Sequence, residues 1–244
     1  LIPDGLLQCE AGVSTKEIID TVTRVVAEVA EEHGANTSVA LAMAKAAMVE
    51  HVEEDEELPP WDIVDEAFED EPVLRDRVKE ALETAHALVL DADALNIIAE
   101  DLPLQDLLLS RREPTVLTPH AMEAARLLRR DVKDVTVDRV AAARELAVQT
   151  GAIVVLKGPG TVTTLRSSRA WINPTGSAML ATAGTGDVLA GMIGAMFAQK
   201  FDMVEATLSA VWLHGRAVEG IEAGVTASSV ARLAADLLDR MRQS

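Results

Sequence analysis

The 244-residue chain contains no tyrosine and only three Trp and three Phe, so aromatic residues make up 2% of it. Aromatic platforms on which nucleic-acid bases stack are therefore scarce. The one cysteine, Cys9, excludes an intramolecular disulfide framework and a metal site built from several cysteines. A single cysteine fits a reducing compartment, so we expect a cytoplasmic protein in which Cys9 is a small buried or incidental residue rather than a nucleophile.

Basic residues are also few, because 22 Lys and Arg stand against 40 Asp and Glu, for a formal net charge of −18. Such a surface repels nucleic-acid phosphate, and no cluster of Lys and Arg overrides it. No apolar run approaches the ~20 residues that span a bilayer, and Leu1–Glu10 lacks the basic region of a secretory signal. We expect neither a nucleic-acid nor a membrane partner. The sequence does not begin with Met, which leaves open whether Leu1 is the true N-terminus.

Glycine is nearly absent from the first 150 residues, which hold only Gly5, Gly12 and Gly34 of the 14 glycines. Glycine allows positive φ angles and a close approach of backbone to a ligand. A backbone cradle for phosphate is therefore predicted in the second half of the chain.

Apolar runs alternate with helical periodicity from residue 87 onward. The predicted buried strands are Ala87–Leu90, Thr115–Leu117 and Ala152–Leu156. A hairpin is predicted over 161–165 and 169–172, turned at 167–168. The predicted helices are 14–33, 38–52, 72–85, 94–99, 120–130, 137–149, 187–199, 203–222 and 227–242, with an exposed loop over 53–60. Strands that alternate with helices predict one α/β layered domain with a mostly parallel central sheet flanked by helices, extending over residues 1–244.

The segment Ala183–Gly191 contains Gly-Thr-Gly-Asp immediately before an apolar helix. Backbone N–H groups exposed at a positive helix end form an anion site. Asp187 lies at that end, where its charged form is favoured, so it could take a proton from a hydroxyl group. The alternative, on these residues alone, is that Asp187 is an N-cap and the glycines serve close packing.

The segment Lys157–Thr161 reads Lys-Gly-Pro-Gly-Thr and follows a predicted strand directly. A lysine with glycines at the carboxyl end of a strand suits nucleotide binding in an open α/β sheet. Its spacing is not that of a Walker P-loop, and by itself the segment is better explained as a tight turn into the hairpin.

Two further polar clusters follow predicted strands. Asp91 and Asp93 could hold a cation or a substrate hydroxyl, although one of them is expected to cap the next helix. His120 and Glu123 share a helix face, although a lone His in this setting is more often a capping or packing residue. Since ligands gather at the carboxyl ends of the strands, four such clusters together predict a real site.

In order along the chain, these segments resemble the ADP/ATP-dependent NAD(P)H-hydrate dehydratases of the ribokinase-like superfamily. The segments that carry the resemblance are Leu90–Asn96, Thr118–His120 with Glu123, Lys157-Gly158, Asn173–Gly176 and Ala181–Gly191. Leu213-His214-Gly215 also fits the family pattern. The resemblance covers residues 88–220, a family-like core, whereas we expect residues 1–87 to be a divergent or incomplete N-terminal part.

The resemblance implies a ribokinase-like fold and the repair of hydrated nicotinamide cofactors. Members of the family phosphorylate the hydroxyl of NAD(P)H hydrate with ADP or ATP and Mg²⁺, and then eliminate phosphate to restore NADH or NADPH. Related proteins form homo-oligomers, which we expect here as well.

The resemblance also assigns roles to residues. Asp187 is expected to be the base, and the anion hole is expected at Gly184, Thr185 and Gly186. The nucleotide is expected to contact Lys157, Gly158, Pro159, Gly160, Thr161 and Gly186. The hydrate is expected to contact His120, Asp93, Asn96 and Asp187, while Glu123 organises Mg²⁺.

One segment departs from the family pattern. Where the family has a glycine-rich loop, residues 64–71 contain no glycine and several carboxylates, which would repel cofactor phosphates. This segment leaves open a nucleotide-binding subunit without catalytic activity. A ribokinase-like kinase of a small molecule is a second alternative.

Overall fold

The computed structural model describes residues 71–166, 169–198, 201–221 and 224–243. Several predictions of the sequence lie outside these residues. They are the helices and the loop before residue 61, the glycine-free stretch up to residue 70 and the turn at 167–168. The strands are β1 (Leu88–Leu90), β2 (Thr115–Leu117), β3 (Ile153–Leu156), β4 (Val162–Thr164) and β5 (Ala170–Ile172).

The helices form two sequence groups. The first comprises α4 (Glu71–Thr84), α5 (Asp93–Glu100), α6 (Leu102–Ser110), α7 (Ala121–Leu128), α8 (Val132–Val137) and α9 (Arg139–Thr150). The second comprises the short 3₁₀ helix η1 (Ala178–Leu180), α10 (Thr185–Ala198), α11 (Met203–Ala217) and α12 (Ala227–Gln243).

In the described part of the chain, the five strands form one sheet in the order β1-β2-β3-β4-β5. β1, β2 and β3 pair in parallel, whereas β4 pairs antiparallel with both β3 and β5. Four of these five strands consequently run in one direction, as the sequence predicts. The segments after β1, β2, β3 and β5 therefore begin at the same edge of the sheet.

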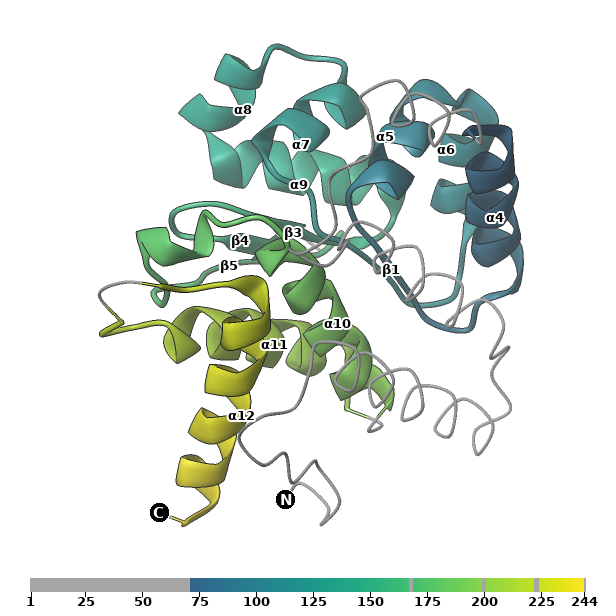
Figure 1. Cartoon of the computed structure of the whole chain (residues 1–244). Coiled ribbons are helices and arrows are strands. Elements are labelled where there is room, and N and C mark those ends of the chain that lie inside the picture. The colour runs from purple at the N-terminus through teal and green to yellow at the C-terminus, as the bar shows by residue number, and fades with distance from the viewer. Residues whose placement is uncertain (1–70, 167–168, 199–200, 222–223, 244) are drawn as a thin grey trace, which may run out of the picture. The chain divides into compact units, whose positions relative to one another are not determined.

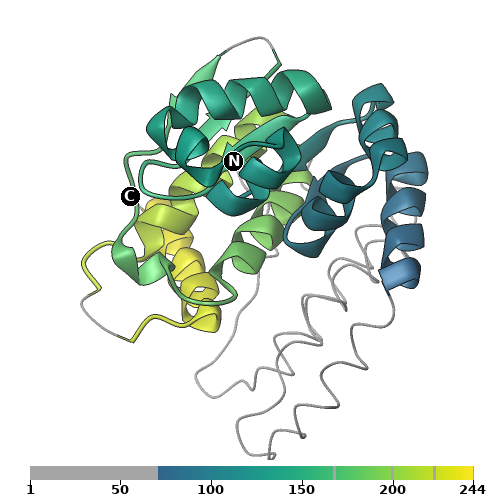
Figure 2. The same ribbon diagram turned by 90° about the horizontal axis from the view of Figure 1, so that it is seen from above.

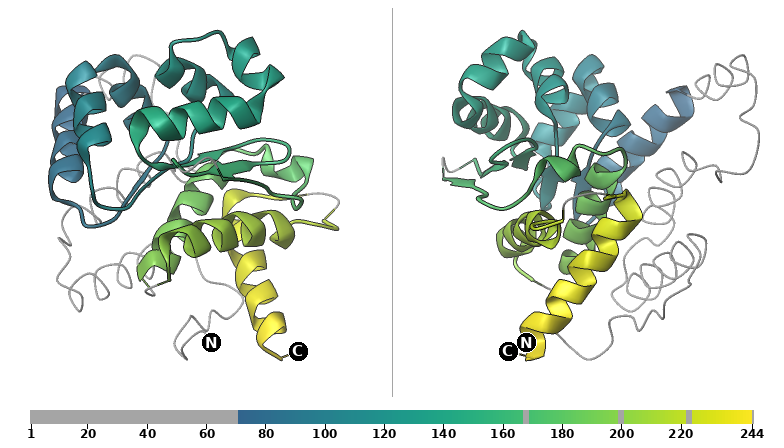
Figure 3. Two further views of the ribbon diagram at one scale, coloured as in Figure 1. Left: turned by 180° about the vertical axis from the view of Figure 1, so that it is seen from behind. Right: turned by 60° about the vertical axis from the view of Figure 1, so that its left-hand side comes forward.

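Helices cover both faces of the sheet (Figure 1). One face carries Val116, Ile153 and Val155, which pack with Leu189 and Ile193 of α10 and with α11. The other face, which includes the fully buried Leu117 and Val154, lies under the first group of helices. Figures 2 and 3 show the two groups of helices from above, from behind and from one side. The predicted layered α/β architecture is confirmed.

Two short α-helices, α6 and α8, and the 3₁₀ helix η1 were not predicted. α6 begins after Asp101, whose side chain accepts the Leu104 N–H at 3.0 Å, and α8 begins after Asp131, whose side chain accepts the Lys133 N–H. The aspartate caps were visible in the sequence, but six to nine residues are too few for a clear helical period. α11 also ends earlier than the predicted residue 222, ahead of Gly220 with its φ of +81°. None of the described helices is long and apolar enough to cross a membrane.

Candidate functional site

The strand ends are tied together by hydrogen bonds just beyond the sheet. The Thr118 N–H donates to the Leu90 carbonyl at 3.1 Å, and the Lys157 N–H donates to the Pro119 carbonyl at 2.8 Å. These bonds continue the parallel pairing past β1, β2 and β3. The polar segments that the sequence places after each strand are therefore neighbours in space.

An ion pair between Lys157 and Asp91 lies at this edge. Lys157 Nζ is 2.6 Å from Asp91 Oδ1, and the two side chains are only 21% and 11% exposed. A charge so poorly solvated depends on its partner, since removing one would leave the other unpaired in a low-dielectric setting. Asp91 therefore fixes the place of the Lys157 ammonium group.

Gly186 lies directly against this ion pair. A Cβ atom at Gly186 would be 3.2 Å from Lys157 Nζ and 3.4 Å from Asp91 Oδ2. The loop predicted to bind nucleotide and the helix start predicted to form an anion hole thus meet at one place, although about thirty residues separate them in the sequence.

His120 and Glu123 form a capping box at the start of α7. His120 Nδ1 accepts the N–H groups of Met122 and Glu123, each at 3.1 Å, and Glu123 Oε2 accepts the His120 N–H at 2.6 Å. The Nδ1 atom accepts, so the neutral ring carries its proton on Nε2. The capping role that the sequence left open for His120 is confirmed, whereas its contact with substrate stays a prediction.

Glu123 is buried, and burial is the main cause that raises the pKa of its carboxyl group. The His120 N–H and the charge of Lys157 oppose this shift, while the charge of Asp91 adds to it. Glu123 therefore belongs electrostatically to the same cluster as the ion pair.

Magnesium binding by Glu123 stays a prediction, because its Oε2 accepts the His120 N–H and its Oε1 lies 3.2 Å from His120 Nε2. In the described part of the chain, no group of three or more His, Cys, Asp or Glu side chains could hold a metal ion. Mg²⁺ does not need such a group, because it commonly takes one or two carboxylates and fills its other positions with water and substrate phosphate. Asp91 and Glu123 could supply those carboxylates.

The start of α10 is held by uncharged groups. The Thr185 hydroxyl donates to the carbonyls of Leu180 at 2.7 Å and Thr182 at 2.9 Å. His214 Nε2 lies 2.8 Å from the Thr185 carbonyl, and both residues are buried. Burial lowers the pKa of His214, helped by the positive charge of Lys157, so the ring is neutral and donates from Nε2.

Asp187 is the third residue of α10 and is exposed. α10 begins at Thr185, so the alternative that Asp187 is the N-cap of this helix is wrong. Gly184, with a φ of +79°, precedes the helix in a conformation that suits glycine. Gly186 and Asp187 thus occupy the first turn, where the helix dipole favours an anion.

Asp93 and Asn96 lie on α5. Asn96 Oδ1 accepts from Arg126 Nη1 at 2.6 Å, and Asp93 is exposed at the first helical position. The N-cap of α5 is Ala92, without a side-chain cap, so the expectation that Asp91 or Asp93 caps this helix is wrong. Ala92 has φ of +49° and ψ of −119°, a strained conformation for a residue with a side chain. This strain lies beside Asp91, within the cluster.

The segment after β5 is fixed onto α11. Thr175 Oγ1 lies 2.9 Å from the Trp212 carbonyl, to which it donates, and Asn173 Nδ2 donates to the Val211 carbonyl at 3.3 Å. A Cβ atom at Gly215 would lie 2.3 Å from Thr175 Oγ1. Close packing therefore requires glycine beside His214, which explains the sequence Leu213-His214-Gly215.

Sequence reasoning assigned no role to Arg139, and none to His214 beyond its place in a motif. Arg139 contacts the loop after β3, and His214 contacts the start of α10. An Arg in the first turn of the helix predicted over 137–149 was the available signal for Arg139, because a cation is unfavourable there.

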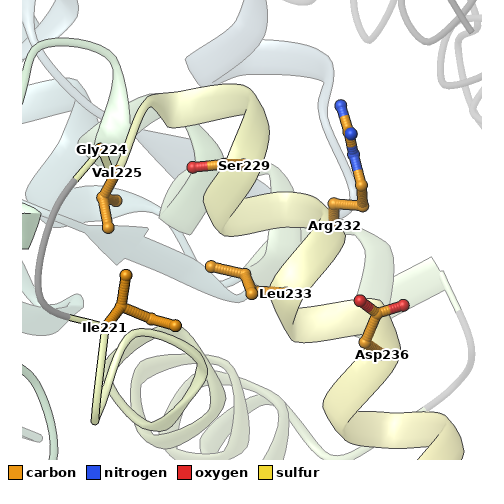
Figure 4. Close-up of a pocket in the computed structure, with 7 residues that line it drawn as sticks. All are labelled: Ile221, Gly224, Val225, Ser229, Arg232, Leu233 and Asp236. Carbon is orange, nitrogen blue, oxygen red and sulfur yellow. The ribbon is translucent and has the colours of Figure 1, made fainter. Parts of the chain in front are cut away.

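A pocket of about 290 Å³ lies between the segment after α11 and α12 (Figure 4). Its lining residues are Ile221, Gly224, Val225, Ser229, Arg232, Leu233 and Asp236. None of these belongs to the polar clusters at the sheet edge. The candidate site is consequently defined by the convergence of side chains, not by this pocket.

The family model described as NAD(P)H-hydrate dehydratase matches residues 11–240. An ADP-dependent (S)-NAD(P)H-hydrate dehydratase from Neisseria meningitidis is 42% identical over 167 residues, which cover 66% of this chain and 56% of that protein. The bifunctional NAD(P)H-hydrate repair enzyme Nnr from Gloeobacter violaceus is 47% identical over 151 residues, 62% of this chain and 28% of that protein. The match thus spans about half of the first relative and about a quarter of the second.

Two solved structures are also similar to this chain. An ADP/ATP-dependent NAD(P)H-hydrate dehydratase from Bacillus subtilis, co-crystallised with ATP/Mg²⁺, has a TM-score of 0.62 at 32% identity and covers 69% of this chain and 60% of that one. A ribokinase-like superfamily protein from Enterococcus faecalis has a TM-score of 0.54 at 22% identity, with 71% and 68% covered. The ribokinase-like fold predicted from the sequence is confirmed.

Proposed function

The chain belongs to the NAD(P)H-hydrate dehydratase family, and we propose that it converts NAD(P)H hydrate to NADH or NADPH at the expense of ADP or ATP. The observation that carries this proposal is the contact of Gly186 with the Lys157–Asp91 ion pair. It brings a fixed ammonium group to the helix start that bears Asp187. Phosphoryl transfer needs such positioning and charge neutralisation rather than a protein nucleophile.

In this proposal Asp187 removes the proton of the hydrate hydroxyl, and the hydroxyl oxygen attacks the terminal phosphorus of the nucleotide. The bond between that phosphorus and the bridging oxygen breaks, which leaves AMP from ADP or ADP from ATP. Gly184, Thr185 and Gly186 bind the transferred phosphoryl group with backbone N–H groups at the positive end of α10. The phosphate then leaves with its oxygen, a proton is lost from the neighbouring carbon, and the ring double bond is restored.

Lys157 neutralises phosphate charge at the point of transfer, and Asp91 keeps it there. The loop Gly158–Thr161 binds the rest of the nucleotide, whereas His120, Asp93 and Asn96 contact the hydrate. Mg²⁺, when bound, supplies further neutralisation of phosphate charge, and Asp91 and Glu123 would hold it. A cytoplasmic location and a homo-oligomeric state are also part of this proposal.

The test mixes the protein with NADH hydrate, Mg²⁺ and either ADP or ATP, and follows the near-ultraviolet absorbance of the reduced nicotinamide ring. We expect a rise in absorbance that depends on nucleotide, with one phosphate released for each NADH formed. A stable phosphorylated product would indicate a kinase instead, and ADP binding without turnover would indicate a non-catalytic subunit.

A further inference from the structure

Arg139 is the first residue of α9, where a positive charge is unfavourable to the helix. The helix dipole places partial positive charge at this end, so a cation there destabilises the helix. The preceding residue, Asp138, already supplies the N-cap by accepting the Ala141 N–H at 2.9 Å. The local helix therefore gives no reason for Arg139, and the reason must lie in the tertiary structure.

The guanidinium group of Arg139 binds three carbonyl groups around the loop after β3. Nη2 donates to the Leu156 carbonyl at 2.9 Å, and Nη1 donates to the carbonyls of Pro159 and, at 3.4 Å, Gly160. The side chain is partly buried, and burial lowers its pKa. Placing a cation in this environment is costly, and the three carbonyl bonds offset that cost.

These bonds set the direction of the loop's peptide groups. In a trans peptide the C=O and the following N–H point in opposite directions. With the carbonyls of Pro159 and Gly160 turned toward Arg139, the N–H groups of Gly160 and Thr161 point away from it. Gly160 with a φ of +59°, like Gly158 with a φ of +142°, adopts a conformation that L side chains rarely reach. The loop therefore presents amide donors on the face opposite Arg139.

Gly158 also lies against the guanidinium group. A Cβ atom at Gly158 would be 3.0 Å from Arg139 Nη2. The glycine and the arginine thus fit together as one unit, and a change in either should disturb the other.

We propose that Arg139 is a positioning residue: it holds the loop Gly158–Thr161 so that the loop's amide donors bind the oxygen atoms of a nucleoside di- or triphosphate. The inference deepens the proposed function and rests on it for the identity of the ligand. Arg139 acts only through the loop. It should govern nucleotide affinity and leave hydrate affinity nearly unchanged.

The experiment compares Arg139→Met and Arg139→Lys with the wild-type chain and with Arg130→Met. Arg130 pairs with Glu145 at an exposed site away from the loop, so it is the matched control. Calorimetry with ADP gives Kd, and steady-state assays give KM for ADP and for NADH hydrate. We expect Arg139→Met to raise the Kd and KM for ADP about tenfold, the loss of about one hydrogen bond from a loop N–H to a charged phosphate oxygen.

The KM for hydrate should stay within about twofold in Arg139→Met, and Arg130→Met should match the wild type for both ligands. Arg139→Lys should recover part of the affinity for ADP, because an ammonium group replaces only some of the bonds. An unchanged Kd in Arg139→Met, or equal losses for ADP and hydrate, would overturn the proposal. If Arg139→Met does not fold, Arg139→Lys decides, because it keeps the positive charge but replaces only some of the carbonyl bonds. This variant should weaken the binding of ADP but not that of hydrate, and full affinity for ADP would contradict the role proposed for Arg139.

Failure of the proposed function has a different signature. A wild-type protein that binds ADP but does not regenerate NADH contradicts the dehydratase activity, and the calorimetric comparison still decides the role of Arg139. A wild-type protein that does not bind ADP overturns the proposal for Arg139 as well.

Discussion

The loop after β3 and the start of α10 are both glycine-bearing segments near the Lys157–Asp91 ion pair, yet they are supported differently. The loop is held by a charged side chain, because Arg139 donates to its carbonyls. The start of α10 is held by uncharged groups, the imidazole of His214 and the hydroxyl of Thr185. Both supports use backbone carbonyls and leave the opposite side of the backbone for other partners.

At this site a cation supports only the loop after β3, whereas neutral groups support the start of α10. Near α10 the positive charge comes from Lys157, which Asp91 balances at 2.6 Å. A second cation in the place of His214 would lie in the field of Lys157, whose charge already helps to lower the pKa of His214. A neutral support avoids this repulsion. The loop after β3 has its carbonyls turned to one side. The guanidinium group of Arg139 donates hydrogen bonds to them there, in place of water.

The largest effect is expected at the start of α10. Asp187→Asn should reduce turnover by roughly 10²–10⁴-fold, the usual contribution of a general base, because the amide cannot take the hydroxyl proton. Calorimetry should give an ADP affinity within about threefold of the wild type, since the backbone donors are unchanged. Asp106→Asn, an exposed change on α6, is the control. Retained turnover would show that Asp187 is not the base, and the start of α10 would then not be the catalytic one of the two segments.

A smaller effect is expected at the loop segment. Lys157→Ala should weaken ADP binding about tenfold or more, and hydrate binding less, because the ammonium group lies beside the anion site at Gly186. Calorimetry with each ligand measures both losses, and Lys133→Ala, an exposed change on α8, is the control. Equal losses for the two ligands would place Lys157 outside the nucleotide site.

The support of α10 can be tested at Gly215, next to His214. Gly215→Ala should lower the free energy of unfolding by about 1–3 kcal/mol, because its Cβ would overlap Thr175, including backbone atoms 2.8 Å away. Gly191→Ala is the matched control: it lies within α10 with open space around its Cβ position and should be stabilising by about 0.5–1 kcal/mol. Urea unfolding measures both, and a Gly215→Ala protein as stable as the wild type would refute the close packing of α11 on Thr175.

The smallest effect is expected in the pH dependence of the free energy of unfolding, which tests whether His214 supports α10 as a neutral group. The pKa of His214 lies below its ordinary value of 6.5 in the folded protein, so below that pH the unfolded chain binds the extra proton first. Stability from this group is therefore full above 6.5 and is lost as the pH falls toward the folded-state pKa. His214→Gln keeps a donor for the Thr185 carbonyl but does not titrate, so its stability should fall less between about pH 7.5 and pH 5.5. Urea unfolding at both pH values checks this, and equal losses in the two proteins would show that His214 is not the buried neutral group described above.

Much of the candidate site could be predicted from the sequence because its residues follow short apolar strands. Three such strands begin or end within one residue of their predicted bounds, and parallel pairing then brings Asp91, His120 and Lys157 to one edge. The roles of Asp93 and Asn96 remain predictions, since the contact of Asn96 runs to Arg126 on α7. The capping box of His120 and Glu123 was visible as a spacing of three residues.

The class of fold and the order of the motifs could be read from the sequence, because periodicity and local spacing are properties of neighbouring residues. The family came from the resemblance of those motifs to known members. Only the tertiary structure decided that Gly186 touches Lys157, that His214 supports Thr185 and that Arg139 turns the carbonyls of the loop. The residues joined by these contacts are 17 to 29 positions apart in the sequence. Local propensity carries no information over such a separation, because the contact depends on how the strands pair and the helices pack.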